Sequence, residues 1–166
     1  NIFFNLTPRK WNTVVNDWIN RNKSIKLPWD VRYECIGIMG EGVLCFNSAT
    51  KPWKIPLIVR KDGRESIVNI LVKFEDVRKD KLTMIIAEFI QKICNKLVDI
   101  EIYNVFPIDS GCGWIEMVEQ SNTLYDIKYK FKCTLQNYIM DLNPNATVSQ
   151  IREKFIKTCV SSCVLC

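Results

Sequence analysis

The sequence predicts an α+β fold in which an antiparallel sheet carries one long packed helix and is followed by further helices. Several strand-like runs follow one another in residues 33–74 with only turns between them. A single apolar stripe at helical spacing then occupies residues 82–97, before two more strand-like runs. A doubly wound parallel sheet would need strands and helices to alternate along the chain, and here they do not.

Composition sets the first limits. The chain has 166 residues and is 48% apolar, which is enough for one domain with a sizeable core. No run of 18 uncharged apolar residues occurs, so the sequence predicts no membrane-spanning helix. The net charge of +5 fits an anionic partner such as a nucleotide or a membrane surface, and it equally fits a solvated surface. A nucleic-acid-binding protein would be more basic and would show its own motif, so we expect no nucleic-acid partner.

The chain has eight cysteines and no histidine. The cysteines are scattered through apolar segments or lie at helical spacing near the end, and the single CxxC, at Cys163 and Cys166, has no second CxxC to pair with. A zinc site would have to be built from cysteines alone, so we expect no metal ligands and interpret the cysteines as reduced core residues. The lack of histidine also removes the commonest general base.

The first half of the chain divides into a helix and two sets of strands. Residues 7–22 place apolar side chains at helical spacing, with Thr7 able to cap and Pro8 at the first helical position. Residues 33–46 then predict two short strands around a Gly-Glu-Gly turn. The runs "IPLIV" and "SIVNILVKF" predict a hairpin, because Asp-Gly lies in the turn between them.

The second half contains the clearest helix and several shorter elements. Leu82, Ile85, Ile86, Phe89, Ile90, Ile93 and Leu97 form the apolar stripe of the long helix. Two strands, "DIEIYNVFPI" and "GWIEMVE", follow it, and "TLYDIK" and "TLQNYIMDL" predict short helices. Thr147 and Gln150 form a capping box for a final helix over residues 148–166.

One pair of charged residues suggests phosphate chemistry. Lys73 closes an apolar strand, and Asp80 lies at the start of the long helix. A strand lysine that lies between ATP phosphates and an orienting carboxylate is the arrangement that kinases use. On these two residues alone, a surface ion pair worth about 0–1 kcal/mol is the better interpretation.

Four motifs in a fixed order extend this pattern, and together they resemble the phosphoinositide 3-/4-kinase family with its related protein kinases. They are "CFNSATKPWKIPLIV", "KFEDVRKD", "IYNVFPIDSGCGWIEMV" and "FIKTCVSSCVLC", and the resemblance covers residues 31–166. The second motif is about a residue shorter than is usual in the family, and Val77 replaces its common leucine. Thr50 stands where the first motif usually has lysine, so Lys51 or Lys54 would serve instead.

The resemblance implies a kinase-like N-lobe over residues 1–119, with an N-terminal helix and a hinge, and the beginning of a C-lobe over residues 120–166. It also implies an ATP site. In this site Lys73 contacts the phosphates, Asp80 holds Lys73, and Ser48 covers the phosphates. Tyr103 lines the back of the adenine pocket, Ile115 lies at its neck, and the backbone C=O of Glu116 and N–H of Val118 hydrogen-bond adenine.

Each of these assignments has a structural alternative that the sequence leaves open. Ile115, Met117 and Val118 are also ordinary strand residues, and Tyr103 is also a core residue with a satisfied hydroxyl. The charged residues between Lys73 and Asp80 fit a solvated turn better than a catalytic role. Trp53 would either flank the nucleotide or, as an exposed loop residue, touch a membrane.

The family's catalytic loop and its metal-binding Asp-Phe-Gly are absent, so we expect a fragment with no catalytic residue of its own. The ligands of Mg²⁺ would then lie outside this chain. The full enzyme would transfer the γ-phosphate of ATP to an inositol lipid hydroxyl, as a cytoplasmic protein peripheral to membranes, with a regulatory subunit as a further partner. The alternatives are a related Ser/Thr protein kinase and a non-catalytic kinase-like interaction domain.

Overall fold

The computed structural model describes residues 25–94 and 100–163, together with Thr13, Asp17 and Arg21. Apart from those three positions, the helix predicted over residues 7–22 lies outside the described residues. The chain forms two compact units. The first contains residues up to Met84 and Tyr103–Met117, and the second contains Ile85–Ile102 and Val118–Cys166.

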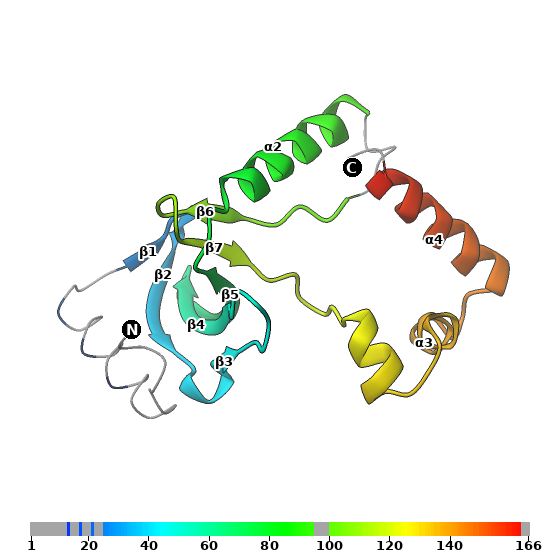
Figure 1. Ribbon diagram of the computed structural model, residues 1–166, viewed down its shortest axis with the longest axis horizontal. Coiled ribbons are helices and arrows are strands. Elements are labelled where there is room, and N and C mark those ends of the chain that lie inside the picture. Colours follow the sequence, from blue (N-terminus) through cyan, green and yellow to red (C-terminus); the bar gives the residue numbers. More distant parts are fainter. Residues whose placement is uncertain (1–12, 14–16, 18–20, 22–24, 95–99, 164–166) are drawn as a thin grey trace. The chain divides into compact units, whose positions relative to one another are not determined.

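The first unit is built on a sheet that, among the described residues, has seven strands, all paired antiparallel (Figure 1). The strands are β1 (Ile25–Leu27), β2 (Asp30–Ile38), β3 (Leu44–Cys45), β4 (Trp53–Lys61), β5 (Arg64–Lys73), β6 (Val105–Pro107) and β7 (Gly113–Glu116). Their order is β1-β2-β4-β5-β7-β6, and β3 pairs with β4. The predicted α+β class with an antiparallel sheet is confirmed.

The longest pairing is the β4–β5 hairpin, which runs in unbroken register from Trp53 opposite Val72 to Lys61 opposite Arg64. Its turn residues, Asp62 at φ 50° and Gly63 at φ 76°, both have left-handed backbone conformations. This two-residue turn matches the right-handed twist of the strands, which is why Asp-Gly predicts it. The hairpin predicted from the sequence is confirmed.

Apolar side chains are buried on both faces of the sheet, because residues two apart on a strand share a face. One face carries the larger core cluster, which comprises Leu27, Cys35, Trp53, Ile55, Leu57, Val59, Ile70 and Val72. The other face carries a smaller cluster of Val77, Val105 and Ile115, with Leu71, Met84 and Tyr103 packed against it. Lys73 shares a face with Leu71, so this smaller cluster borders the lysine that the sequence analysis singled out.

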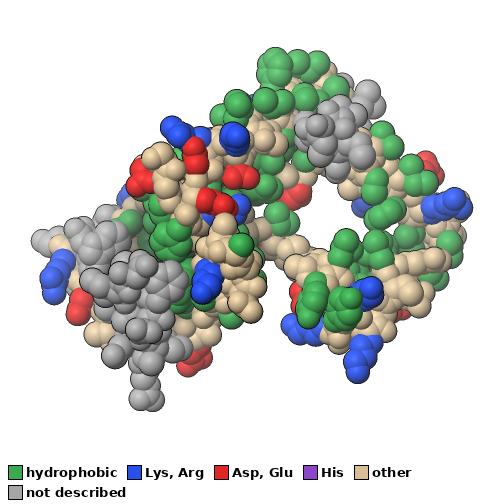
Figure 2. Space-filling model, in the orientation of Figure 1, with side chains coloured by type: hydrophobic (Ala, Val, Ile, Leu, Met, Phe, Trp, Pro, Cys, Tyr) green, Lys and Arg blue, Asp and Glu red, His purple; other side chains and the backbone are tan. Residues whose placement is uncertain are grey.

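Helix α2 (Arg78–Ile93) begins in the first unit and continues into the second. Most of the described residues of its predicted apolar stripe are exposed: Leu82 is 56%, Phe89 62% and Ile93 66% exposed. Figure 2 shows that apolar side chains lie along α2. The long helix predicted from the sequence is present; its Ala87 is buried, and its Met84 packs against the smaller cluster.

The second unit is helical. A π-helical segment (Asp126–Lys130) lies where a short helix was predicted and is followed by α3 (Leu135–Leu142) and α4 (Val148–Cys163). The capping box at the start of α4 is confirmed: the Thr147 backbone N–H donates to Gln150 Oε1 at 2.9 Å, and the Gln150 N–H donates to Thr147 Oγ1 at 3.3 Å. Within the described ranges, no helix is long and apolar enough to cross a membrane.

Candidate functional site

Lys73 is the centre of the candidate site. It is the last residue of β5, and its Cα pairs with that of Gly113 on β7. Its side chain is 24% exposed, and its Nζ lies 2.9 Å from Glu75 Oε1. The amine is therefore held in place while it keeps access to solvent.

The surroundings of Lys73 favour its charged form. The hydrogen bond with Glu75 is the main cause that raises the pKa of Lys73, and the nearby charges of Asp80 and the Tyr103 phenol act in the same direction. Partial burial acts against them, because it penalises the ammonium. The result is a cation that stays protonated at neutral pH and whose neighbours are acidic.

The direct partner of Lys73 is Glu75, whereas the resemblance assigns that role to Asp80. Asp80 acts on Lys73 as a second negative charge, without an ion pair between the two side chains. β5 ends at Lys73 and the chain bends at Phe74 and Glu75, so strand periodicity does not predict this pairing. Glu75 was assigned to a solvated turn, and this is the site residue that the sequence interpretation missed.

A tight turn after Glu75 fixes the start of α2. Asp76 Oδ1 accepts the backbone N–H of Arg78 at 3.0 Å, and its carboxylate also binds the Arg78 guanidinium at 2.7 Å. This hydrogen bonding lowers the pKa of Asp76 to about 2. Val77, between the two, is fully buried in the smaller cluster. The charged residues thus hold the turn in shape while Val77 anchors it to the sheet.

Val77 can pack at this position only because residue 113, a glycine, has no side chain. A Cβ added to Gly113 would lie 2.0 Å from Val77 Cγ2 and 3.1 Å from the Phe106 carbonyl oxygen. Because Gly113 is also the strand partner of Lys73, this close approach sets the spacing between the lysine strand and the turn that carries Glu75.

Glu116 organises the far end of β7. Its Oε2 accepts the backbone N–H of Asn104 at 3.1 Å and the Asn104 side-chain amide at 2.6 Å. The Glu116 backbone N–H donates to the Asn104 carbonyl at 2.8 Å. Because the N–H and C=O of one strand residue point the same way, the Glu116 carbonyl also faces away from β5. The resemblance assigns the Glu116 carbonyl to adenine. The Glu116 side chain anchors Asn104, a role that the sequence did not indicate.

The remaining residues assigned to the adenine pocket lie in different surroundings. Ile115 is 9% exposed and pairs with both Leu71 and Val105, so it is a core residue of the smaller cluster. Tyr103 packs against the same cluster. Val118 belongs to the second unit, is 38% exposed, and accepts a hydrogen bond from Ser121 Oγ at 2.7 Å.

The loop between β3 and β4 holds Ser48 at an exposed position. Its base is closed by the Phe46 N–H, which donates to the Pro52 carbonyl at 2.9 Å, and its tip by the Lys51 N–H, which donates to the Ser48 carbonyl at 3.1 Å. Lys51 has a left-handed backbone with φ 43°. The loop is therefore a defined hairpin connection with Ser48 at its tip.

Trp53 and Lys54 follow this loop and point to opposite faces of the sheet. Trp53 is 8% exposed and belongs to the larger core, so the expectation of an exposed tryptophan touching a membrane is wrong. Lys54 pairs with Leu71 on β5 and therefore lies on the same face as Lys73. Of the two lysines that could replace the one missing at Thr50, Lys54 is the one that the strand register brings towards Lys73.

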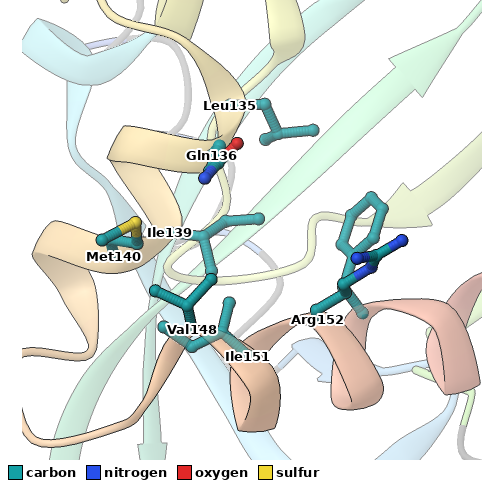
Figure 3. A pocket seen from close by; sticks show the side chains of 8 residues that line it. Leu135, Gln136, Ile139, Met140, Val148, Ile151 and Arg152 are labelled. Atoms are coloured by element: carbon teal, nitrogen blue, oxygen red, sulfur yellow. The ribbon is translucent and has the colours of Figure 1, made fainter.

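The apolar hollow between α3 and α4 has a different character. It encloses about 370 Å³ and is lined mainly by apolar side chains, with Arg152 as its one charged residue. Ile139, Val148 and Ile151 meet where the two helices approach each other (Figure 3). Such a lining fits helix packing better than it fits phosphate binding.

No protein-family model matches the chain, and a comparison of its sequence with curated proteins finds no match.

Proposed function

We propose that this chain is the ATP-binding N-terminal portion of a phosphoinositide kinase, with a kinase-like N-lobe. The observation that carries the proposal is the Lys73 ammonium, held 2.9 Å from Glu75 on the sheet face next to Asp80 and Tyr103. The full enzyme would transfer the γ-phosphate of ATP to an inositol lipid hydroxyl at a membrane surface.

The site residues fit a triphosphate on chemical grounds. An ammonium has three N–H donors, and the single contact with Glu75 Oε1 leaves the others for phosphate oxygens. Lys54 adds a second cation to the same face, and among the described residues no ion pair neutralises it. Two cations on one face offset the charge of phosphate oxygens, which is the electrostatic part of phosphoryl transfer.

The acidic neighbours have a positioning role in this proposal. Glu75 and Asp80 keep Lys73 charged and limit the rotamers of its long side chain. The Lys73 side chain would then be oriented before the phosphates bind. Mg²⁺, whose ligands we expect outside this chain, would supply the remaining charge neutralisation at the phosphates.

Nucleotide binding tests the proposal. A fluorescent ATP analogue is titrated with Mg²⁺ onto the full chain, onto Lys73→Met and onto Lys79→Met. Lys79 is an exposed lysine in the first turn of α2, so it controls for the loss of one positive charge. We expect Lys73→Met to weaken binding about tenfold or more, as for the loss of a charged hydrogen bond, and Lys79→Met to leave it within about twofold.

Two results would count against the proposal. Saturable binding that Lys73→Met leaves unchanged would remove Lys73 from the nucleotide site. The absence of saturable binding to the parent chain would favour the non-catalytic alternative, a kinase-like interaction domain. Binding alone does not separate lipid from protein kinases, for which the comparison is phosphate transfer by the full-length protein to phosphatidylinositol vesicles and to a protein substrate.

A further inference from the structure

A second hollow lies at the opposite end of the β4–β5 hairpin from Lys73. It encloses about 380 Å³ and is lined by Tyr33, Lys61, Asp62, Arg64 and Ser66. Arg64 and Lys73 are the two ends of β5, which places them about 30 Å apart along the strand at ~3.3 Å per residue. The hollow is therefore separate from the candidate nucleotide site.

The strand register explains why these residues converge. Lys61 pairs with Arg64, and Val59 pairs with Ser66. Tyr33 lies two residues before Cys35, which pairs with Val59 on the other side. All of these side chains share the face of the larger core cluster, and they continue it beyond the last buried residues as a polar rim.

The hollow has an excess of positive charge. Lys61 Nζ lies 4.4 Å from the centroid of the Tyr33 ring and 3.6 Å from Asp30 Oδ2. Asp30 is also bound to the Arg32 guanidinium at 2.6 Å, so its one negative charge serves two cations. Asp62 is the only carboxylate among the residues that line the hollow.

Arg64 is the strongest unused donor at this position. Among the described residues its guanidinium takes part in no ion pair and no side-chain hydrogen bond, whereas the adjacent arginine on β4, Arg60, is paired with Glu65 at 2.8 Å. Tyr33 and Ser66, which both carry hydroxyl groups, line the same hollow as Arg64. Guanidinium, ammonium and hydroxyl donors around one hollow are the groups that bind phosphate oxygens.

We infer that this hollow binds a phosphate monoester, with Arg64 as its main ligand and Lys61 as a second cation held in place by Tyr33 and Asp30. The inference does not depend on the proposed nucleotide site, because it uses other residues on the other face of the sheet. A soluble phosphorylated metabolite and a phosphatidic-acid headgroup present the same group, and the experiment separates them.

The full chain is titrated with glycerol 3-phosphate at constant ionic strength, and its co-sedimentation is measured with phosphatidylcholine vesicles that contain phosphatidic acid. Vesicles with phosphatidylserine at matched surface charge are the control for charge alone. Arg64→Gln removes the main ligand. Arg60→Gln is the matched variant, because it removes the same charge from an adjacent strand position on the opposite face of the sheet.

We expect saturable binding of the monoester that Arg64→Gln weakens about tenfold and that Arg60→Gln and Lys73→Met leave within about twofold. Binding of glycerol 3-phosphate indicates a soluble ligand, and binding of phosphatidic-acid vesicles alone indicates a lipid ligand. The inference is overturned if neither probe binds, if phosphatidylserine vesicles bind equally well, or if Arg60→Gln weakens binding as much as Arg64→Gln. Loss of binding in Lys73→Met but not in Arg64→Gln would also overturn it.

Discussion

The close contact between Gly113 and Val77 leads to a quantitative prediction for Gly113→Ala. The new Cβ would lie 2.0 Å from Val77 Cγ2, well inside the ~3.5–4.0 Å at which carbon atoms pack best. Val77 is fully buried, and the Phe106 carbonyl at 3.1 Å closes the other side. Relief therefore requires a backbone shift or a strained side chain, and overpacking of this kind costs about 1–3 kcal/mol.

Urea unfolding followed by tryptophan fluorescence measures this cost as a lower midpoint, and Trp114 lies next to the substitution. Gly111→Ala is the matched control, because its nearest neighbour, Asp109 Oδ1, is at an ordinary 3.6 Å. We expect the control to stay within about 0.5 kcal/mol of the parent. If both variants unfold at the same urea concentration, Val77 and residue 113 do not make this close contact.

A double-mutant cycle sharpens the same prediction. Val77→Ala alone leaves a cavity and costs about 1–3 kcal/mol. The added methyl group at residue 113 would enter that cavity, so the double variant should be more stable than the sum of the two single effects predicts, by about 1–2 kcal/mol. Strict additivity of the two changes would show that the side chains do not meet.

Three further predictions concern charged and capping residues. Glu75→Gln removes the negative charge of the group whose hydrogen bond raises the pKa of Lys73, so this pKa should fall, as an NMR titration of the lysine side chain would show. Asp76 should titrate near pH 2, below an ordinary carboxyl, because Arg78 binds its charged form; its stabilisation is present above about pH 4 and is lost as the pH falls through about 2. Thr147→Ala removes half of the capping box of α4 and should lower stability by about 1 kcal/mol, measured by thermal unfolding.

Each of these predictions has a contradicting result. An unchanged pKa of Lys73 in Glu75→Gln would place the two side chains apart in solution. An Asp76 titration near pH 4 would show that its bonds to Arg78 do not persist. If Thr147→Ser lowers stability as much as Thr147→Ala, the loss does not come from the hydroxyl that caps the helix.

Local chemistry made much of the fold predictable. The Asp62-Gly63 turn, the strand runs on either side of it and the Thr147–Gln150 box depend on residues close together in the sequence, and all three are confirmed. The exposed stripe of α2 was not predictable in the same way. Helical periodicity identifies an apolar face, but it does not say what covers that face.

The candidate site was predictable only in part, for the same reason. Lys73 and Asp80 stand out as charges at the ends of two apolar elements, and the register that brings Lys54 to the face of Lys73 follows from the hairpin. The choice of Glu75 over Asp80 as the direct partner depends on the shape of the turn at Val77, and that shape depends on Gly113, more than thirty residues later. A long-range packing contact of this kind leaves no local pattern in the sequence.

The central claim, that the Lys73 amine lies beside the phosphates of ATP, is tested most directly by an acyl-phosphate derivative of ATP. This reagent transfers its acyl group to a lysine next to the bound phosphates, and peptide mass spectrometry identifies the residue. The account predicts acylation of Lys73, with Lys54 as the second site, and protection of both by excess Mg-ATP. Labelling confined to other lysines, or labelling that Mg-ATP does not reduce, would contradict it.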